Sequence, residues 1–183
     1  MRSGMHAVAP WRRDYGGLAR VTGFSMVELL VAVLVMGVGV LGVTGLQVVS
    51  LQNNRDALVR SEALLLAYDI LDRMRVNPAG NYAGVNFDDA PVSAGNCYSS
   101  NCSPTQMSRF DLTVWQCALG DHNAADVCIA LRDDVILPAA TSQPGLPDGQ
   151  GQIEVNGAGM VTVRVRWTGF NGVQEVLSVE SQS

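Results

Sequence analysis

The chain has 183 residues, of which 48% are hydrophobic and 16% charged, a size that fits one small domain beside an apolar anchor. Its 17 acidic residues outnumber its 12 basic residues, and the formal net charge is −5. Every basic residue is an arginine, and the arginines form no stripe interleaved with aromatic residues. This composition argues against nucleic acid as a partner.

The chain begins with a polar, basic segment that runs directly into a long apolar one. The arginines before the apolar segment face a single acid, Asp14, and are Arg2, Arg12, Arg13 and Arg20. By the positive-inside tendency, this segment stays in the cytoplasm and the C-terminal part is sent outward. Within residues 24–51 the only charged residue is Glu28. Because an ionised carboxylate in hydrocarbon costs roughly 2.5–3.5 kcal/mol on insertion scales, Glu28 is a functional-site candidate that needs a partner.

Two ordinary targeting segments fit this pattern less well. A secretory signal peptide has an apolar core of about 7 to 15 residues followed by a small-residue cleavage site, whereas this apolar run is much longer. A signal anchor accounts for the length, because about 20 apolar residues span a bilayer. It leaves Glu28 and the preceding Gly23-Phe24 pair unexplained.

The sequence Gly-Phe-Ser-Met-Val-Glu at residues 23–28, with the apolar residues after it, resembles the class III leader junction of type IV pilins and pseudopilins. In that family a membrane-embedded prepilin peptidase cuts after the glycine and methylates the new N-terminal residue. The resemblance implies a leader of residues 1–23, cleavage between Gly23 and Phe24, and an N-methylated Phe24. It also implies that Glu28 pairs with the Phe24 amine of a neighbouring subunit, an attraction that is strong in low dielectric although desolvation offsets much of it.

The apolar pattern becomes amphipathic after residue 51 without a helix-stop signal, which predicts one helix over residues 25–76. Residues 24–51 form its membrane or filament-core half, and residues 52–77 form its amphipathic half. Asn77-Pro78 ends the helix. In the second half one face recurs at three- and four-residue steps, and we expect it to pack on the globular domain: Ala57, Leu58, Ser61, Leu64, Leu65, Tyr68 and Leu71.

Charge pairs and glycines mark the rest of this helix. Asp56 with Arg60 and Asp69 with Arg73 are spaced for i,i+4 ion pairs on a solvated face. Four glycines in the first half each cost helix stability of roughly 0.5–1 kcal/mol. They suit either a segment that melts locally or close helix packing, and they are Gly37, Gly39, Gly42 and Gly45.

Residues 78–183 are predicted to form a periplasmic or extracellular globular domain that holds all four cysteines. An even number of cysteines in an oxidising compartment predicts two disulfides. Three pairings are open, and loop closure favours Cys97 with Cys102 and Cys117 with Cys128. Zinc is disfavoured because no Cys-x-x-Cys pair occurs.

The remaining pattern predicts two short helices followed by a three-stranded antiparallel meander. Helices are expected over residues 107–119 and 125–134, and strands over 153–155, 161–168 and 173–180. The strands meet at Asn-Gly dipeptides, which suit tight hairpins. Trp115 and Trp167 are expected in the core. The predicted fold class is α+β, a type IV pilin-like fold in which a long N-terminal helix packs on a small antiparallel sheet with disulfide-bearing loops.

Three downstream features are similar to the PilV group of type IV pilus minor pilins, also called type IV pilus modification proteins. They are the segment around Trp115, the Leu-Pro-x-Gly-x-Gly turn at residues 146–151, and the Val-Thr-Val-Arg-Val-Arg-Trp strand at residues 161–167. The resemblance implies a tip-associated minor pilin that helps to prime pilus assembly and influences adhesion and twitching motility. Its implied partners are other minor pilins, the major pilin, the prepilin peptidase and the inner-membrane assembly machinery. A minor pseudopilin of type II secretion is the alternative.

The resemblance places the protein in the bacterial inner membrane before assembly and on the pilus afterwards. No enzymatic activity and no cofactor are expected. His122 is the only histidine after the leader, and neither Gly-x-Ser-x-Gly nor His-Glu-x-x-His occurs. The acid pairs Asp88-Asp89 and Asp133-Asp134 lack the alternating spacing of a calcium loop, so surface solvation is the better interpretation and no metal is expected.

Overall fold

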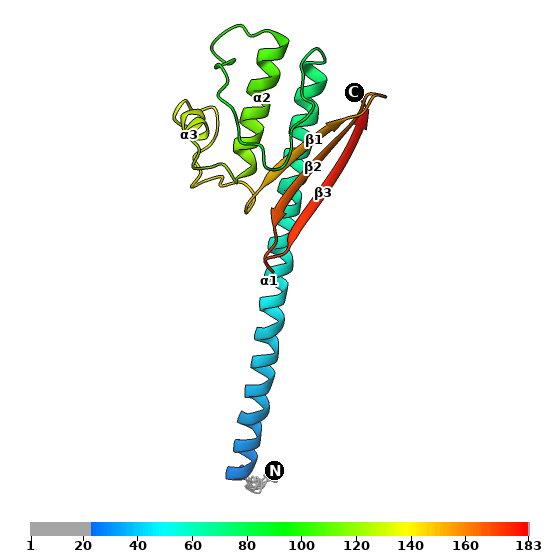
Figure 1. Ribbon diagram of the computed structural model, residues 1–183. Helices are drawn as coiled ribbons and strands as arrows, with labels where there is room; N and C mark the ends of the chain where they lie inside the picture. The colour runs from blue at the N-terminus through cyan, green and yellow to red at the C-terminus, as the bar shows by residue number, and fades with distance from the viewer. Residues whose placement is uncertain (1–22, 183) are drawn as a thin grey trace, which may run out of the picture. The chain divides into compact units, whose positions relative to one another are not determined.

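The computed structural model describes residues 23–182, in which three helices and three strands alternate with loops (Figure 1). The elements are α1 (Met26–Val76), α2 (Pro104–Leu119), α3 (Asp126–Asp133), β1 (Gln150–Val155), β2 (Met160–Thr168) and β3 (Gln174–Gln182). The chain divides into two compact units between Gly45 and Leu46. The second unit contains the later part of α1 together with every other element, which confirms the predicted α+β fold of a long helix on a small antiparallel sheet.

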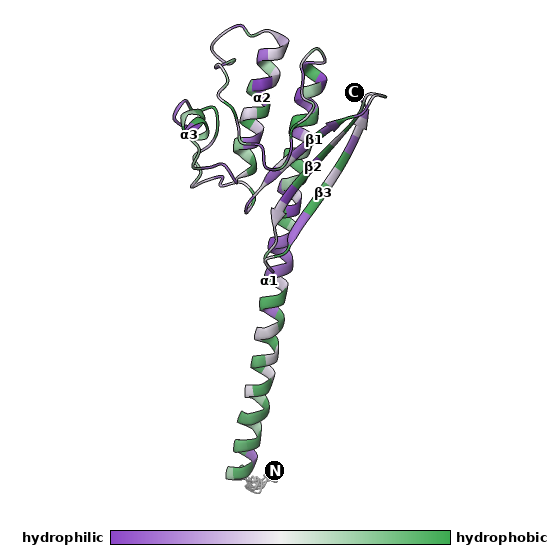
Figure 2. Cartoon of the chain, in the orientation of Figure 1, coloured by the Kyte–Doolittle hydropathy of each residue, from purple (hydrophilic) through white to green (hydrophobic). Residues whose placement is uncertain are grey.

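Helix α1 is a single uninterrupted helix of 51 residues, as predicted. At 1.5 Å per residue it is about 77 Å long. Its last turn closes when the Asn77 amide donates to the carbonyl of Arg73 at 3.1 Å, and Pro78 follows. The first half is almost uniformly hydrophobic and the second half is mixed (Figure 2). Within the described residues, α1 is the one helix long and apolar enough to cross a membrane, with an 18-residue window of mean hydropathy 2.5.

The sheet is an antiparallel meander in the order β1-β2-β3. Central strand β2 pairs Val163 with Ile153 on one side and with Val179 on the other. The hairpins close where the Asn156 amide donates to the Met160 carbonyl and the Gly169 amide donates to the Val173 carbonyl. Strand β1 begins at Gln150, three residues before its predicted start, because its first residues continue the register opposite β2.

The main core lies between the sheet and the second half of α1. Strand β2 alternates as predicted and buries Val161, Val163, Val165 and Trp167, while Trp115 of α2 is fully buried in the same cluster. Both tryptophans therefore occupy the core, as expected from the sequence.

The predicted inner face of α1 is wrong. The buried residues are Ala63, Ala67, Ile70 and Leu71, and only Leu71 belongs to the predicted set. Leu58 and Leu65 are instead 71% and 70% exposed. Both stripes follow three- and four-residue steps, so periodicity fits either of them. The face with Ala63 and Ala67 is the one that faces the core, where both lie in one buried cluster with the inward valines of β2.

Helix α2 begins three residues earlier than predicted, because a capping box precedes it. The Ser103 hydroxyl accepts the amide of Gln106, and the Gln106 side chain accepts the amide of Ser103 at 2.9 Å. Pro104 occupies the first helical turn, where its missing amide hydrogen costs nothing. Helix α3 matches the predicted segment to within one residue at each end.

The Leu-Pro-Asp-Gly-Gln-Gly turn at residues 146–151 packs closely against α2. Leu146 is buried, and its amide donates to the carbonyl of Leu119 at 2.7 Å. A Cβ on Gly149 would lie 2.1 Å from that same carbonyl oxygen, and a Cβ on Gly151 would lie 2.2 Å from the ring of Trp115. The two glycines are therefore required by the close approach of the turn and the start of β1 to α2.

Gly151→Ala should destabilise the domain, because the added methyl must displace the Trp115 ring from the core. Overpacking of this kind costs about 1–3 kcal/mol, which corresponds to a fall in Tm of about 2–12 °C for a chain of this size. Gly157→Ala is the matched control, since a Cβ there meets nothing within 4 Å. Thermal unfolding of both purified variants checks the difference, and equal Tm values would contradict the packing role of Gly151.

Candidate functional site

The residues of the predicted leader junction lie at the start of α1. Gly23 and Phe24 precede the helix, and the Phe24 side chain is 84% exposed. Ser25 begins the hydrogen bonding, because its carbonyl accepts the Leu29 amide at 3.2 Å and its hydroxyl accepts the Val27 amide at 3.4 Å. Glu28 lies exposed in the first helical turn, where the helix dipole favours a negative charge. Gly23, Phe24 and Glu28 are thus all exposed within six consecutive residues.

The first half of α1 has no partner within the described chain. Every residue from 26 to 51 is exposed. A Cβ added at any of its four glycines would meet nothing within 4 Å. Burial of this apolar surface therefore requires a lipid environment or neighbouring subunits.

The end of α1 is fastened to α2 by a buried polar cluster, the Asp111 cluster, formed by Arg73, Asn77, Tyr82 and Asp111. Asp111 is 6% exposed; its Oδ1 accepts Arg73 Nη1 at 3.1 Å and its Oδ2 accepts the Tyr82 hydroxyl at 2.6 Å. Asn77 Nδ2 donates to Tyr82 Oη at 3.2 Å and to the Pro104 carbonyl at 2.8 Å. Arg73 also pairs with Asp69 at 2.9 Å.

One of the two predicted i,i+4 ion pairs of α1 forms in the described residues. The pair Asp69–Arg73 forms, and Arg73 uses it to reach the Asp111 cluster. The described residues contain no ion pair between Asp56 and Arg60. The first pair is thus part of a tertiary contact, whereas the second is a solvated helix surface, which is the simpler interpretation of the sequence.

Two groups of the Asp111 cluster titrate away from their ordinary ranges. Burial and the hydrogen bond to Asp111 together raise the pKa of the Tyr82 hydroxyl well above its usual value. Burial lowers the pKa of the Arg73 guanidinium, but hydrogen bonds and charge interactions with Asp69 and Asp111 outweigh it, so the pKa is raised. Both groups therefore keep their protons in the folded chain.

Stability should fall at alkaline pH through Tyr82. Because its pKa is higher folded than unfolded, the folded state holds the phenolic proton more tightly. This contribution is complete below the unfolded pKa of about 10 and is lost as the pH rises above it, at up to about 1.4 kcal/mol per pH unit. Denaturant midpoints between pH 8 and pH 11 should fall more steeply for the natural chain than for Tyr82→Phe, and parallel curves would contradict the assignment.

The four cysteines form two local disulfides, Cys97–Cys102 and Cys117–Cys128. This is the pairing that loop closure favoured. The second bond joins α2 to α3 and is buried in a small core with Phe110, Val114 and Leu131. The disulfides thus cross-link the loop before α2 and join α2 to α3.

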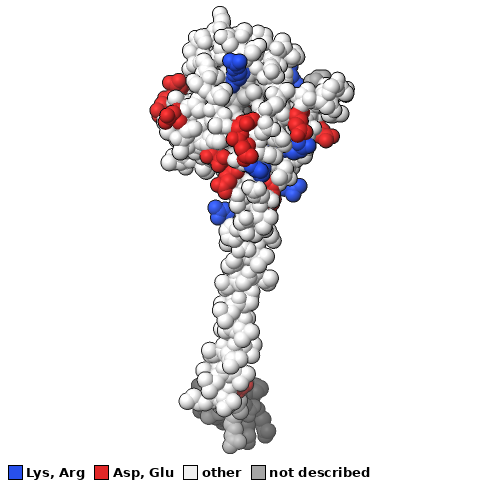
Figure 3. Space-filling model, in the orientation of Figure 1, with Lys and Arg blue, Asp and Glu red and all other residues white. Residues whose placement is uncertain are grey.

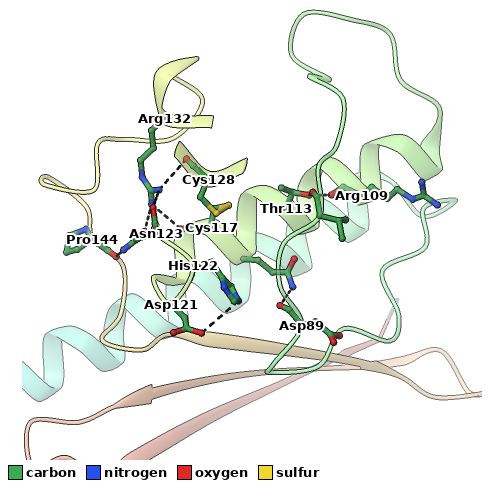
Figure 4. The surroundings of a disulfide bond; sticks show 12 residues. Asp89, Arg109, Thr113, Cys117, Asp121, His122, Asn123, Cys128, Arg132 and Pro144 are labelled. Atoms are coloured by element: carbon green, nitrogen blue, oxygen red, sulfur yellow. Dashed lines mark hydrogen bonds and ion pairs between the residues drawn. A yellow bond between two sulfur atoms is a disulfide. The ribbon is translucent and has the colours of Figure 1, made fainter. Parts of the chain in front are cut away.

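Arg132 of α3 braces the second disulfide (Figure 4). Its Nη2 donates to the carbonyl of Cys117 at 3.2 Å, and its Nη1 donates to the carbonyl of Cys128 at 3.3 Å. It also donates to the carbonyl and side-chain oxygens of Asn123, whose amide holds the Pro144 carbonyl at 2.6 Å. One guanidinium therefore connects both cysteines with the loop that leads toward β1.

Asp88 and Asp89, one of the acid pairs considered for calcium, form an ion pair and a loop hydrogen bond instead. Asp88 pairs with Arg166 at 3.1 Å, and Asp89 accepts the amide of Asn86 at 2.7 Å. Among residues 23–182, no group of three or more His, Cys, Asp or Glu side chains is placed to hold a metal ion. On the face drawn in Figure 3, acids and arginines are interspersed over the second unit.

The junction residues are neighbours in the sequence, and the cysteines follow about 70 residues or more later in the chain. The structure adds two features that sequence reasoning missed. The capping box at Ser103 was readable from Ser-Pro-Thr-Gln at residues 103–106. The Asp111 cluster had no such signal, because its members come from three separate segments and each is ordinary by itself.

One family comparison gives a match. Residues 45–113 match the family model described as Tt1218-like, type IV pilin Tt1218. Comparisons with curated proteins and with solved structures give no match. The matched segment covers the second half of α1, the loop with the first disulfide and part of α2, and it does not include the junction at residues 23–28. The family match and the leader motif are therefore independent observations.

Type IV pilins are structural subunits rather than enzymes. The long apolar helix, the antiparallel sheet packed on its second half and the two disulfides agree with such a subunit. Residues 45–113, which are less than half of the chain, are thus similar to a type IV pilin domain, and the fold of the described residues is consistent with one.

Proposed function

We propose that the protein is a minor pilin that takes part in priming and assembly of type IV pili, as a tip-associated subunit that affects twitching motility and adhesion. The observation that carries this proposal is the position of the Gly23-Phe24 junction. It lies directly before the start of a fully exposed apolar helix whose continuation matches a type IV pilin family.

The mechanism begins with membrane insertion through residues 24–51. Prepilin peptidase then removes the leader of residues 1–23 and methylates Phe24. The amphipathic half at residues 52–77 and the globular domain at residues 78–183 lie in the periplasm, where both disulfides form. Glu28 pairs with the methylated amine of Phe24 on a neighbouring subunit, and this pair sets the register in which the subunit enters the filament.

The partners in this mechanism are other minor pilins, the major pilin and the inner-membrane assembly machinery. The protein starts as a single-pass inner-membrane protein and ends on the pilus. It carries no catalytic residue and needs no cofactor or metal. The exposed apolar half of α1 supports this order of events, because the same surface suits lipid first and neighbouring helices afterwards.

The proposal is tested by the mass of the N-terminal peptide, measured separately from sheared surface filaments and from membranes. We expect a peptide that begins at methylated Phe24 in the sheared fraction. Processed protein confined to membranes, together with intact pili and trapped secreted proteins in a deletion strain, would favour a pseudopilin of type II secretion. A chain that still carries its leader would contradict both.

Gly23→Val gives the matching test of the cleavage site. The bulky side chain should block processing, so that the leader stays on the membrane-bound chain. Immunoblotting detects the size difference, and a variant still trimmed at Phe24 would contradict the assigned site.

A further inference from the structure

The turn between β2 and β3, residues 168–173, presents apolar side chains to solvent on a fixed backbone. Phe170 and Val173 are each 57% exposed. The Gly169 amide donates to the Val173 carbonyl at 2.9 Å, and the Asn171 side chain accepts the Val173 amide at 3.0 Å. The turn contains no charged residue. The backbone that carries the exposed Phe170 ring is therefore held by hydrogen bonds within the turn, and the Glu175 carboxylate lies close to Gly169.

This turn lies beside α1 (Figure 1), at the point where the helix becomes polar (Figure 2). The Arg55 guanidinium carbon is 5.9 Å from the centroid of the Phe170 ring. The turn and the helix together line a hollow of about 200 Å³, and its lining residues include Arg55, Asp56, Val59 and Phe170. Phe170 and Arg55 thus form one exposed aromatic and cationic pair, the Phe170–Arg55 pair, within the second compact unit.

The position of Arg55 along α1 determines where the Phe170–Arg55 pair lies relative to a bilayer. Residues 29–54 contain no charged residue, so Arg55 is the first charge after Glu28. These residues span about 39 Å as a helix, against a hydrocarbon core of about 30 Å. The polar residues Ser50, Gln52, Asn53 and Asn54 fill the remaining length. With α1 across a bilayer, Arg55 and Phe170 therefore lie at the level of the lipid headgroups.

We propose that the Phe170 turn is a second membrane contact, in which the Phe170 ring enters the bilayer interface beside the emerging helix and Arg55 faces lipid phosphate. Aromatic residues are enriched at this level, and arginine keeps its charge at the interface while its stem lies along apolar surface. The contact fixes the orientation of the globular domain above the membrane before the subunit is extracted. The inference rests on the membrane-spanning role of α1 in the proposed function.

A bilayer fits the pair better than a protein partner does. The exposed ring lies beside Arg55, which follows the last apolar residue of the anchor half, Leu51, by one helical turn. The other end of the sheet, at residues 156–159, carries no aromatic side chain. One end of the sheet is thus suited to lipid and the other is not.

The test uses the full chain reconstituted into vesicles of phosphatidylcholine and phosphatidylglycerol, with or without brominated acyl chains. Phe170→Trp places a fluorophore in the turn, and Ala158→Trp places one in the exposed hairpin turn at the opposite end of β2. The natural tryptophans Trp11, Trp115 and Trp167 contribute the same background to both variants, which the natural chain measures. We expect brominated lipid to remove the added fluorescence of Phe170→Trp and to leave that of Ala158→Trp unchanged.

The outcomes distinguish failure of the lipid contact from failure of the membrane anchor. If the chain resists alkaline extraction but both added tryptophans stay unquenched, the lipid contact is overturned while the membrane anchor stands. If alkaline washing releases the chain from vesicles, the anchor and the contact both fail. If Phe170→Trp is unquenched and Phe170→Ser still abolishes filament incorporation, the turn contacts a neighbouring subunit instead of lipid.

Discussion

Glu28→Ala should leave leader cleavage intact and abolish incorporation of the subunit into filaments. Cleavage is proposed to depend on Gly23 and Phe24, which lie before the helix, whereas the carboxylate is proposed to act only when a neighbour is present. Removing one member of a buried ion pair leaves the other charge uncompensated and costs about 3–5 kcal/mol. At about 1.4 kcal/mol per factor of ten, this exceeds a hundredfold loss of subunit docking.

The measurement compares the amount of processed protein in membranes with the amount in sheared filaments. Glu28→Gln keeps the size of the side chain without its charge, and we expect it to fail as Glu28→Ala does. Thr44→Ala is the matched control, because it removes a polar group from the same apolar half, where the Thr44 hydroxyl bonds only the Val40 carbonyl of its own helix. Normal incorporation of Glu28→Gln would show that the charge is not what selects the neighbour.

Asp111→Ala should be among the most destabilising substitutions in the globular domain. It leaves the Tyr82 hydroxyl and one side of the Arg73 guanidinium without their carboxylate partner, at the junction of α1 and α2. Breaking a buried pair costs about 3–5 kcal/mol. Because Arg73 is 25% exposed and keeps Asp69, we expect the lower end, about 3 kcal/mol, or a fall in Tm of about 6–12 °C.

Asp69→Ala is the control for this effect. It removes the more exposed partner of the same arginine and should cost less than about 1 kcal/mol. Thermal unfolding of the purified full chain in detergent measures both variants. Equal losses would mean that Asp111 acts as an ordinary surface partner of Arg73, and that the Asp111 cluster does not hold the end of α1.

The inner face of α1 shows where sequence reasoning reaches its limit. Leu58 and Leu65 follow helical spacing as regularly as Ala63 and Ala67 do, and they are more hydrophobic. Periodicity gives the repeat and the hydrophobicity of a stripe, but packing against the rest of the domain decides which stripe is buried. Here Ala63 and Ala67 share the core with the valines of β2 and with Trp115.

The parts that were predictable are local in the sequence. The length of α1, the strand alternation around Val163 and the favoured cysteine pairing each depend on residues within a short span. The Asp111 cluster joins Arg73, Tyr82 and Asp111 across 38 positions, and no periodicity relates them. The cleavage site at Gly23 stays a prediction, because it rests on a linear motif at residues 23–28.

The two disulfides have a consequence for the order in which the domain matures during export. Their partners are 5 and 11 positions apart, and each cysteine pairs with its neighbour along the chain. In the proposed topology the N-terminal segment stays in the cytoplasm and residues 78–183 cross the membrane in chain order, so each cysteine meets its correct partner before any incorrect one from the following pair. Both bonds can close as soon as residue 128 has crossed, while the strands from residue 150 onward are still being translocated. Oxidation in order of emergence gives the native pairing without later reshuffling.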